Sequence, residues 1–199
     1  METLRVAGSL QRPGRRDADD TDAALIQRVT TADRNAMRIL FSRHHLAVYR
    51  FVMQRLQDKA LAEDVTSEVF LDVWRSASQF QGRSAVLTWI LAIARHKTFG
   101  ARPKSIIHFG GDIAAAECAD DPEAPLQVQD RKTVLRKCMT QLSVEHREVI
   151  DLVYYQEQSM ESVATILGIP RSTAKTRVFY ARKRLADELR KSGVDWISL

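Results

Sequence analysis

The stretch 105–130 divides this chain of 199 residues into parts of opposite charge. It holds six Asp or Glu residues and no Lys or Arg, so its formal charge is −6, whereas residues 1–104 carry +6 and residues 131–199 carry +5. Two adjacent glycines and two prolines interrupt the stretch, and its apolar residues follow little helical period. The sequence therefore predicts two basic domains joined by a flexible acidic linker.

The composition favours helices in both domains. Apolar residues make up 45% of the chain and charged residues 28%, as in a globular soluble protein, and eight glycines with five prolines leave few turns for a β-rich fold. No apolar run approaches the roughly 20 residues that a membrane helix needs, and no apolar stretch follows the N-terminal arginines as in a secretory signal. Cys118 and Cys138 are too few for a disulfide framework. We expect an all-α protein of the cytoplasm, with no membrane insertion.

The N-terminal domain is predicted to span residues 21–104, after a mobile tail of residues 1–20. Apolar residues recur there at helical spacing. The expected helices are Ala23–Thr30, Arg34–Asp58, Ala60–Arg75 and Ala85–Phe99.

The helix expected over Ala60–Arg75 is the most informative of these. Its core face repeats every four residues, and a neighbouring face carries Asp64, Glu68 and Asp72 at the same interval, with Glu63 beside them. Like charges at this spacing repel one another by a few tenths of a kcal/mol per pair, a cost that a basic partner would offset. A plain solvated face is the alternative interpretation. The core face consists of Leu61, Val65, Val69 and Val73, widened by Phe70 and Trp74.

A polar loop and a basic cluster flank the last helix of this domain. Cations gather at the end of that helix and beyond it, where the helix dipole itself favours positive charge, although a phosphate backbone would attract them too. Trp89 lies on the apolar face, and burial statistics favour a core role for it over base stacking. The cationic residues are Arg95, His96, Lys97, Arg102 and Lys104.

The C-terminal domain is predicted over residues 131–191, followed by a tail of residues 192–199. An apolar helix over Arg131–Leu142 precedes a helix that Ser143 caps, and Ser159 caps a third, short helix. A turn at Gly168 then leads into a longer helix, which is the pattern of a helix-turn-helix motif. A helical hairpin that never meets DNA is the alternative.

The longer helix separates a buried stripe from a polar, basic N-terminal end. Short hydroxyls with Arg and Lys in the first turns suit the reading of base edges in a major groove. The expected buried stripe is Ala174, Val178, Ala181, Leu185 and Leu189, and the candidate reading residues are Arg171, Ser172, Thr173, Lys175, Thr176 and Arg177.

Three stretches together resemble bacterial RNA polymerase sigma factors of the extracytoplasmic-function (ECF, group IV) type. Residues 62–75 are similar to the family's polymerase-binding helix, residues 80–95 to its promoter-melting loop and helix, and residues 142–182 to its domain that reads the minus-35 element. The resemblance covers residues 22–191 in the family's order. Departures from the family's usual residues are Ser67, His96, Gly100 and Ser162, the last removing an expected capping box with Ser159.

The resemblance implies roles for residues and partners. Core RNA polymerase, through its beta and beta-prime subunits, would contact Glu63, Asp64, Ser67, Glu68 and Asp72. The minus-10 element would contact Phe80, Arg83, Ser84, Arg95, His96, Lys97, Arg102 and Lys104. The minus-35 element would contact Arg171, Ser172, Thr173, Lys175, Thr176 and Arg177.

The resemblance also implies promoter melting, with a flipped base held in a loop pocket, and a linker that follows the polymerase's RNA path. It further implies control by an anti-sigma factor in a stress or signal response. No cofactor or metal is expected.

Two other classes of function compete with this interpretation. An enzyme is disfavoured because the chain has no phosphate-binding glycine loop, nucleophile elbow or metalloprotease motif. His44 and His45 are adjacent on a helix and point apart, which makes them a poor chelate. A DNA-binding repressor or activator with a helical sensor domain is the second alternative, and it would bind its operator without polymerase.

Overall fold

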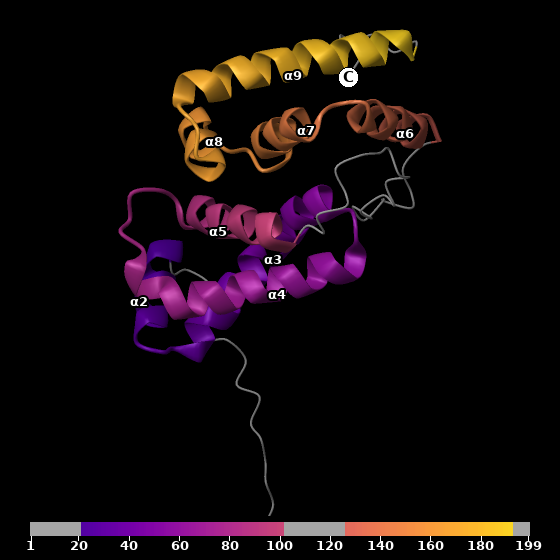
Figure 1. Cartoon of the computed structure of the whole chain (residues 1–199). Coiled ribbons are helices and arrows are strands. Elements are labelled where there is room, and N and C mark those ends of the chain that lie inside the picture. The colour runs from indigo at the N-terminus through magenta and orange to yellow at the C-terminus, as the bar shows by residue number, and fades with distance from the viewer. Residues whose placement is uncertain (1–20, 102–125, 193–199) are drawn as a thin grey trace, which may run out of the picture.

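The computed structural model describes residues 21–101 and 126–192, apart from the side chains of 126–132, and every regular element in these residues is helical. Figure 1 shows two layers of helices, with α2 to α5 in one and α6 to α9 in the other. In chain order the elements are α2 (Asp22–Thr30), α3 (Arg34–Leu56), α4 (Lys59–Ser76), the 3₁₀ turn η1 (Ala77–Gln79), α5 (Val86–Ala101), α6 (Leu126–Thr140), α7 (Val144–Ile150), the π-helical turn η2 (Asp151–Tyr155), α8 (Met160–Leu167) and α9 (Arg171–Lys191).

Capping side chains set the helix ends in the N-terminal domain. The Asp33 carboxylate accepts hydrogen bonds from the backbone N–H groups of Asn35 and Ala36 at the start of α3. The helix predicted to reach Asp58 stops instead at Leu56, because Gln57 adopts the left-handed conformation with φ of 56° and Asp58 caps α4. One short polar turn therefore separates two long helices.

The predicted apolar stripe of α4 forms the centre of the N-terminal bundle. Val65, Val69, Phe70 and Val73 are buried, and Leu61 and Trp74 are partly buried against them. This face packs against α3 and α5, while α2 closes the bundle against α3 and η1. The pattern of one apolar residue every four positions is confirmed.

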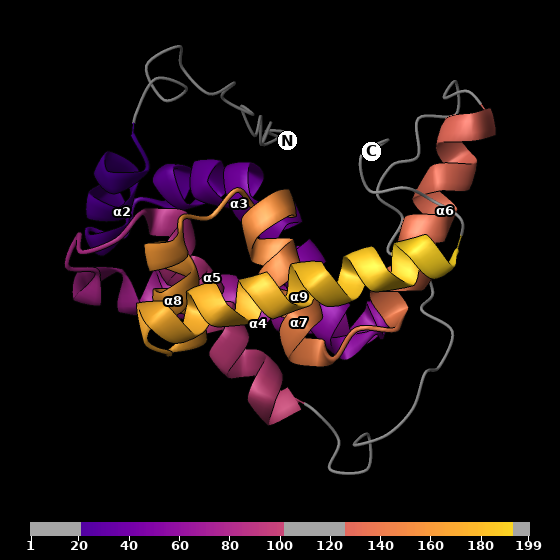
Figure 2. The same ribbon diagram turned by 90° about the horizontal axis from the view of Figure 1, so that it is seen from above.

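The long helix α9 organises the C-terminal domain. Figure 2 shows it crossing over α7 and α8 and reaching α6 at its far end. The predicted stripe is confirmed, since all five of its residues are buried: Ala174, Val178, Ala181, Leu185 and Leu189. Because this stripe faces the other helices, the N-terminal turns of α9 present their remaining sides to solvent.

The helix-turn-helix geometry follows from two local features. The Ser159 hydroxyl accepts a hydrogen bond from the Ser162 N–H at 3.1 Å, so the predicted N-cap of α8 is confirmed. Gly168 ends α8 in the left-handed conformation, with φ of 59°, and Pro170 precedes the first residue of α9. In a capping box the side chain at position 162 would accept a hydrogen bond from the Ser159 backbone N–H. Here the Ser162 hydroxyl instead accepts one from the Ser159 hydroxyl, at 3.0 Å.

Two features of the C-terminal domain differ from the prediction. The helix expected over Arg131–Leu142 runs over Leu126–Thr140, so helical structure begins inside the stretch assigned to the linker. After Ile150 the chain enters the π-helical turn η2 and does not simply continue α7. The extra residue in this turn buries Asp151 and Leu152 and leaves the Tyr154 and Tyr155 side chains exposed.

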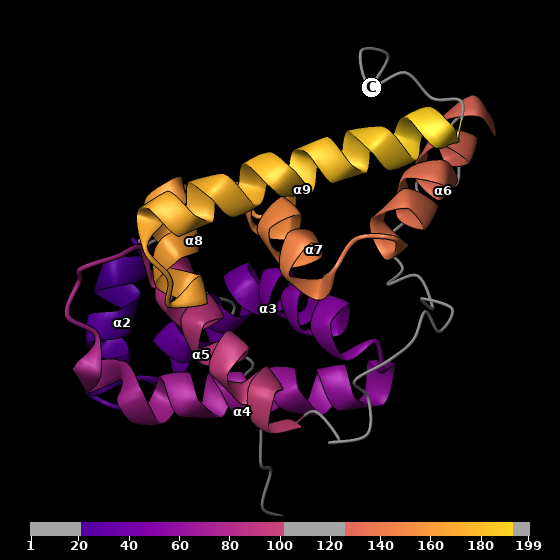
Figure 3. The same ribbon diagram turned by 45° about the horizontal axis from the view of Figure 1, so that its top comes forward.

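The two domains pack against each other. Helix α5 contacts α8, and α3 contacts α7, at the boundary between the two layers visible in Figures 1 and 3. The buried apolar residues of both domains belong to one contiguous cluster. In the described residues no helix is long and apolar enough to cross a membrane.

Replacement of Gly168 tests the turn of the helix-turn-helix. A methyl group added at this position would meet no atom within 4 Å, but φ is 59°, so Gly168→Ala should lower the free energy of unfolding by about 1 kcal/mol through backbone strain alone. Gly100→Ala is the matched control: Gly100 lies in α5 with equally open space and an ordinary φ, so alanine there should stabilise by about 0.5 kcal/mol. Urea unfolding measures both, and equal effects of the two variants would contradict the strained turn.

Candidate functional site

The N-terminal turns of α9 present the predicted reading residues together on one exposed surface. Ser172, Thr173, Lys175 and Thr176 are exposed, and the Thr176 hydroxyl is bonded back to the Ser172 carbonyl at 3.0 Å. No side chain caps the start of the helix, because Pro170 offers none. The residues predicted from the sequence are therefore brought together, with backbone N–H groups of the first turn beside them.

The two arginines of this surface each face an acidic residue. Arg171 lies 3.7 Å from the Glu161 carboxylate of α8, with both side chains mostly exposed. Arg177 is half-buried and lies near Glu145 of α7. Hydrogen bonds from the Glu145 backbone N–H and the Ser143 hydroxyl, together with the Arg177 charge, hold the pKa of Glu145 below its ordinary value.

An exposed aromatic pair extends the same helix and was not predicted from the sequence. Phe179 and Tyr180 are 63% and 54% exposed and pack edge to face, with ring centroids 5.4 Å apart. They lie one turn beyond Lys175 and Thr176. Their exposure could have been predicted from the sequence, because positions 179 and 180 fall between two residues of the buried stripe, Val178 and Ala181.

The acidic face of α4 is confirmed as a surface feature, but its residues differ in their surroundings. Glu63, Asp64, Ser67 and Glu68 are exposed, and Asp72 is half-buried. The Ser67 hydroxyl donates to the Glu63 carbonyl at 3.0 Å. No ion pair links Glu63 or Asp64 to another residue in the described ranges, so these two acids carry the most accessible charge of the face.

Lys97 belongs to this acidic face. Its ammonium lies 3.0 Å from Asp72 and 3.1 Å from Glu68, and these two hydrogen-bonded carboxylates raise the pKa of Lys97. One lysine from α5 thus offsets the repulsion that the sequence implied between two neighbouring acids of α4. The structure does not bring Lys97 together with Arg95, although the two were assigned to one surface.

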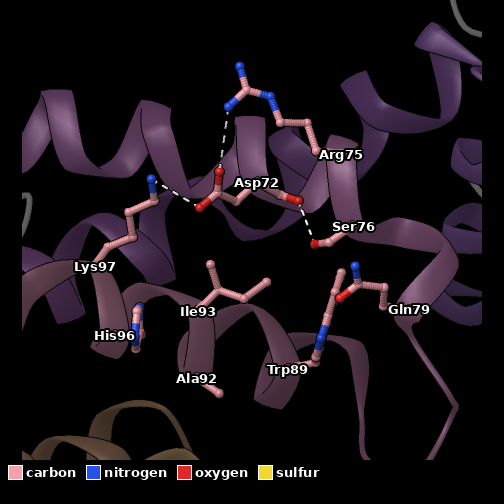
Figure 4. Close-up of a pocket in the computed structure, with 9 residues that line it drawn as sticks. All are labelled: Asp72, Arg75, Ser76, Gln79, Trp89, Ala92, Ile93, His96 and Lys97. Carbon is pink, nitrogen blue, oxygen red and sulfur yellow. Dashed lines mark hydrogen bonds and ion pairs between the residues drawn. The ribbon is translucent and has the colours of Figure 1, made fainter.

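Helices α4 and α5 line an open, shallow pocket of about 460 Å³ beside this ion pair. Figure 4 shows Asp72 and Arg75 of α4 on one side of it and Trp89, Ile93 and His96 of α5 on the other. The pocket combines an indole edge with charged and imidazole groups. Trp89 packs partly against the core, as expected, but part of it also lines this opening.

The loop before α5 holds the remaining predicted residues of the N-terminal domain. Phe80 packs on Trp89, with ring centroids 5.3 Å apart, and Arg83 is exposed. The Ser84 hydroxyl is directed to the Ala85 carbonyl at 3.3 Å. Gly82 has a φ of 68°, a turn that favours glycine.

Arg95 points toward the C-terminal domain. Its Nε lies 3.4 Å from a Glu148 carboxylate oxygen of α7, and its guanidinium stacks over the Phe99 ring at 4.8 Å. Only 23% of the side chain is exposed. The residue expected to meet DNA is therefore partly covered by the other domain.

The Glu148 carboxylate also accepts a hydrogen bond from Arg55 of α3. Both side chains are 5% exposed, so this is a buried ion pair. Arg55 donates a second hydrogen bond to the Thr98 hydroxyl at 2.8 Å and stacks over Phe99. This pair was not predicted from the sequence. The sequence gives only a weak indication of this pair, because Arg55 and Glu148 each occupy a position on the apolar side of a helix.

Asp151 is a second acid buried at this boundary. Burial raises its pKa to about 7, the nearby Glu148 charge acts in the same direction, and Gln156 and Arg50 oppose the shift. With its amide nitrogen turned toward Asp151, Gln54 of α3 donates to both carboxylate oxygens at 3.2 and 3.3 Å.

Several predicted residues lie outside the described part of the chain. These are Arg102, Lys104, Cys118, the linker up to residue 125, and the two tails apart from Ser192. Cys138 is buried, with its Sγ 3.5 Å from the Ser192 hydroxyl. His44 bonds to Asp22 at 2.6 Å, and within the described ranges no cluster of three or more His, Cys, Asp or Glu residues is arranged to hold a metal.

Comparison with known proteins identifies the same two regions. The family described as Sigma-70 region 2 matches residues 40–99, and Sigma-70, region 4 matches residues 138–187. The ECF RNA polymerase sigma factor SigL of Mycobacterium tuberculosis is 28% identical over 86% of this chain and 98% of its own length. The RNA polymerase sigma-H factor of Pseudomonas aeruginosa is 25% identical over 83% of this chain and 92% of its own.

Two solved structures share the fold. One is CnrH in complex with the cytosolic domain of CnrY, with a TM-score of 0.65, 18% identity, and coverage of 86% of this chain and 99% of that one. The other is the sigma factor RpoE with the anti-sigma factor NepR from Bartonella quintana, with a TM-score of 0.57, 22% identity, and coverage of 77% and 96%.

Substitution of Asp151 tests its buried environment through pH. The native pKa of about 7 lies above the ordinary 3.8, so the native state binds more protons in this range. The resulting stabilisation is complete below about pH 4 and disappears as the pH rises through 7. Asp151→Asn removes this dependence. Its free energy of unfolding should therefore gain roughly 1–3 kcal/mol relative to the native protein between pH 5 and pH 8.

Urea unfolding at several pH values measures this difference. Asp187→Asn is the control, because Asp187 is a partly exposed acid paired with Arg190 and should show no such trend. If the free energy of unfolding changes with pH in the same way for Asp151→Asn and the native protein, Asp151 is ionised throughout this range and the prediction is wrong.

Proposed function

We propose that this chain, which belongs to the RNA polymerase sigma factors of the extracytoplasmic-function type, binds core polymerase, directs it to specific promoters and helps to melt the DNA. The observation that carries the proposal is the combination of two exposed surfaces in one chain. An acidic face lies on α4 of the region 2 domain, and a basic, hydroxyl-rich end lies on α9 of the region 4 domain. The proposal gives each surface one partner, core polymerase for the first and promoter DNA for the second.

The acidic face of α4 is our proposed contact with core polymerase. Glu63 and Asp64 supply its exposed charge, and Ser67 and Glu68 continue it along the helix. Asp72 and Glu68 both pair with Lys97, but Asp72 is half-buried at the end of the face and therefore contributes less to a basic partner. Complementary charge of this kind speeds association and fixes orientation.

The loop before α5 and the pocket behind it are our proposed minus-10 surface. Arg83 is exposed and can meet a phosphate, and the rings of Trp89 and His96 line an opening of about 460 Å³. Phe80 packs on the Trp89 ring. Stacking of an unpaired base on aromatic rings contributes about 1–3 kcal/mol, which offsets the cost of extracting it from the duplex. Arg95, Arg102 and Lys104 complete the proposed set.

The start of α9 is our proposed minus-35 reader. Its exposed side chains suit a major groove: Lys175 and Arg177 for guanine, and Ser172, Thr173 and Thr176 for phosphates or base edges. Arg171 lies at the first turn, where it suits a phosphate. The domains proposed for these roles span residues 21–104 and 131–191, joined by the acidic linker.

Regulation by an anti-sigma factor fits the two solved structures, since each shows a protein of this fold with a bound partner, and the partner of RpoE is an anti-sigma factor. We place the protein in the cytoplasm, where the polymerase acts.

Gel filtration with core polymerase followed by transcription from a promoter library tests the proposal. Co-elution and new start sites would support it. A stand-alone regulator would instead shift duplex DNA without polymerase.

Charge reversal on α4 tests the polymerase contact. Asp64→Lys with Glu68→Lys should abolish co-elution with core polymerase, because both acids are exposed and neither supports the core. The control reverses two acids of the other domain, Glu161 and Asp187, and should leave co-elution intact. Circular dichroism verifies the helix content of each variant. Normal co-elution of the α4 variant would exclude this face as the contact.

Truncation of Arg177 tests the minus-35 assignment. Arg177→Ala should weaken holoenzyme binding by roughly 1–3 kcal/mol and relax selectivity at one base pair, if this side chain reads a base. Arg190→Ala removes the same charge at the far end of α9, where Arg190 pairs with Asp187, and should alter affinity little. If both variants weaken binding equally on every promoter sequence, Arg177 contributes only nonspecific attraction to the DNA charge and reads no base.

A further inference from the structure

The contact between the domains covers part of α5, the helix that carries the proposed minus-10 surface. Thr88 is fully buried, and its hydroxyl donates to the Gln158 side chain at 3.0 Å. Two turns further along α5, Arg95 lies against Glu148. One face of α5 therefore contacts the region 4 domain at both Thr88, in its first turn, and Arg95, two turns later.

Glu148 is the centre of this contact. Its carboxylate, presented by α7, accepts a hydrogen bond from Arg55 of α3 and lies 3.4 Å from Arg95 of α5. Both guanidinium groups stack over Phe99, at 4.9 and 4.8 Å. A single acid of the region 4 domain thus forms ion pairs with two cations from two helices of the region 2 domain.

Neutral hydrogen bonds extend the contact along its edge. The Gln156 amide donates to the Ala47 carbonyl of α3 at 3.2 Å. The Gln158 amide donates to the Gln156 carbonyl at 2.8 Å, which holds Gln158 in place to accept from Thr88. The contact is therefore specific in geometry as well as in charge.

We propose that Glu148 latches the free chain in a closed state that withholds Arg95 and its face of α5 from minus-10 DNA until the domains separate. This inference rests on the proposed function. In the closed state the latch is internal, formed by residues of this chain alone.

The size of the closed chain supports this role. Elements centred near positions −10 and −35 lie about 25 base pairs apart, or about 85 Å along B-form DNA. A compact chain of this length has a radius of gyration of about 16 Å and a diameter of about 40 Å. One closed molecule cannot span both elements, so the domains must separate before both surfaces engage a promoter.

Glu148→Ala tests the latch in the full-length protein by small-angle scattering and by DNA binding. Without the Glu148 carboxylate the closed state loses its ion pairs to Arg55 and Arg95, so the domains should separate and the radius of gyration should rise clearly above the value of about 16 Å for a compact chain. The DNA probe is a fluorescent single strand carrying the non-template minus-10 sequence of a promoter that the holoenzyme transcribes. The variant should bind it about tenfold more tightly.

Matched variants separate the latch from general charge effects. Asp187→Asn also removes one negative charge but lies on α9 away from the boundary, so it should change neither readout. Adding Arg95→Ala to Glu148→Ala should cancel the gain in DNA affinity while leaving the chain expanded. Gln158→Ala removes only neutral hydrogen bonds, those with Thr88 and with the Gln156 carbonyl, and should give the same changes at smaller size, even if Glu148→Ala fails to fold.

Three results would overturn the proposal. One is an unchanged radius of gyration in a folded Glu148→Ala variant, and another is a native protein that is already extended. The third is an expanded variant that binds the strand no better, which would remove the masking role. Transcription by holoenzyme made with the native chain is measured separately, so its absence identifies failure of the proposed function and not of the latch.

Discussion

The buried ion pair between Arg55 and Glu148 is the interaction on which the arrangement of this molecule depends. Removing two charges from water costs several kcal/mol, which their attraction offsets only when the remaining polar atoms are satisfied. Here Thr98 accepts from Arg55, and both guanidinium groups stack over Phe99, whereas the buried Arg95 Nε makes no hydrogen bond within the described residues. Such a pair contributes little net stability but permits one geometry, and it therefore defines how the two helical domains meet.

The three faces of α5 explain how one helix serves several surfaces. Thr88 and Arg95, seven residues and two turns apart, face the region 4 domain. Lys97 points the other way and joins the acidic residues of α4, while Trp89 and His96 line the pocket between them. Cations that are neighbours in sequence thus have different partners. The basic end of α5 is a junction of three contacts, and only part of it is available to a phosphate backbone.

Local features were predictable from the sequence, and long-range partners were not. The stripes of α4 and α9 and the caps at Ser143 and Ser159 follow from periodicity and from the chemistry of one or two turns. The pairing of Arg55 with Glu148 joins residues 93 positions apart, and no periodic pattern encodes such a partner. The π-helical turn was also missed, because no periodic pattern in the sequence separates it from a continued α-helix. Lys97 was assigned to DNA from its neighbours in sequence, whereas its side chain reaches back to the preceding helix.

A latch of this kind would make promoter binding depend on polymerase, because only the open fraction of free chains can bind minus-10 DNA. If about 90% of free chains are closed, the apparent affinity of the minus-10 surface falls about tenfold from that of the open form. The exposed acids of α4 lie outside the boundary between the domains, so the contact proposed for core polymerase is the same in either state. A partner that holds the domains apart then restores the full affinity for DNA without touching Arg95. The order of events, polymerase first and promoter second, follows from which surface the closed chain covers.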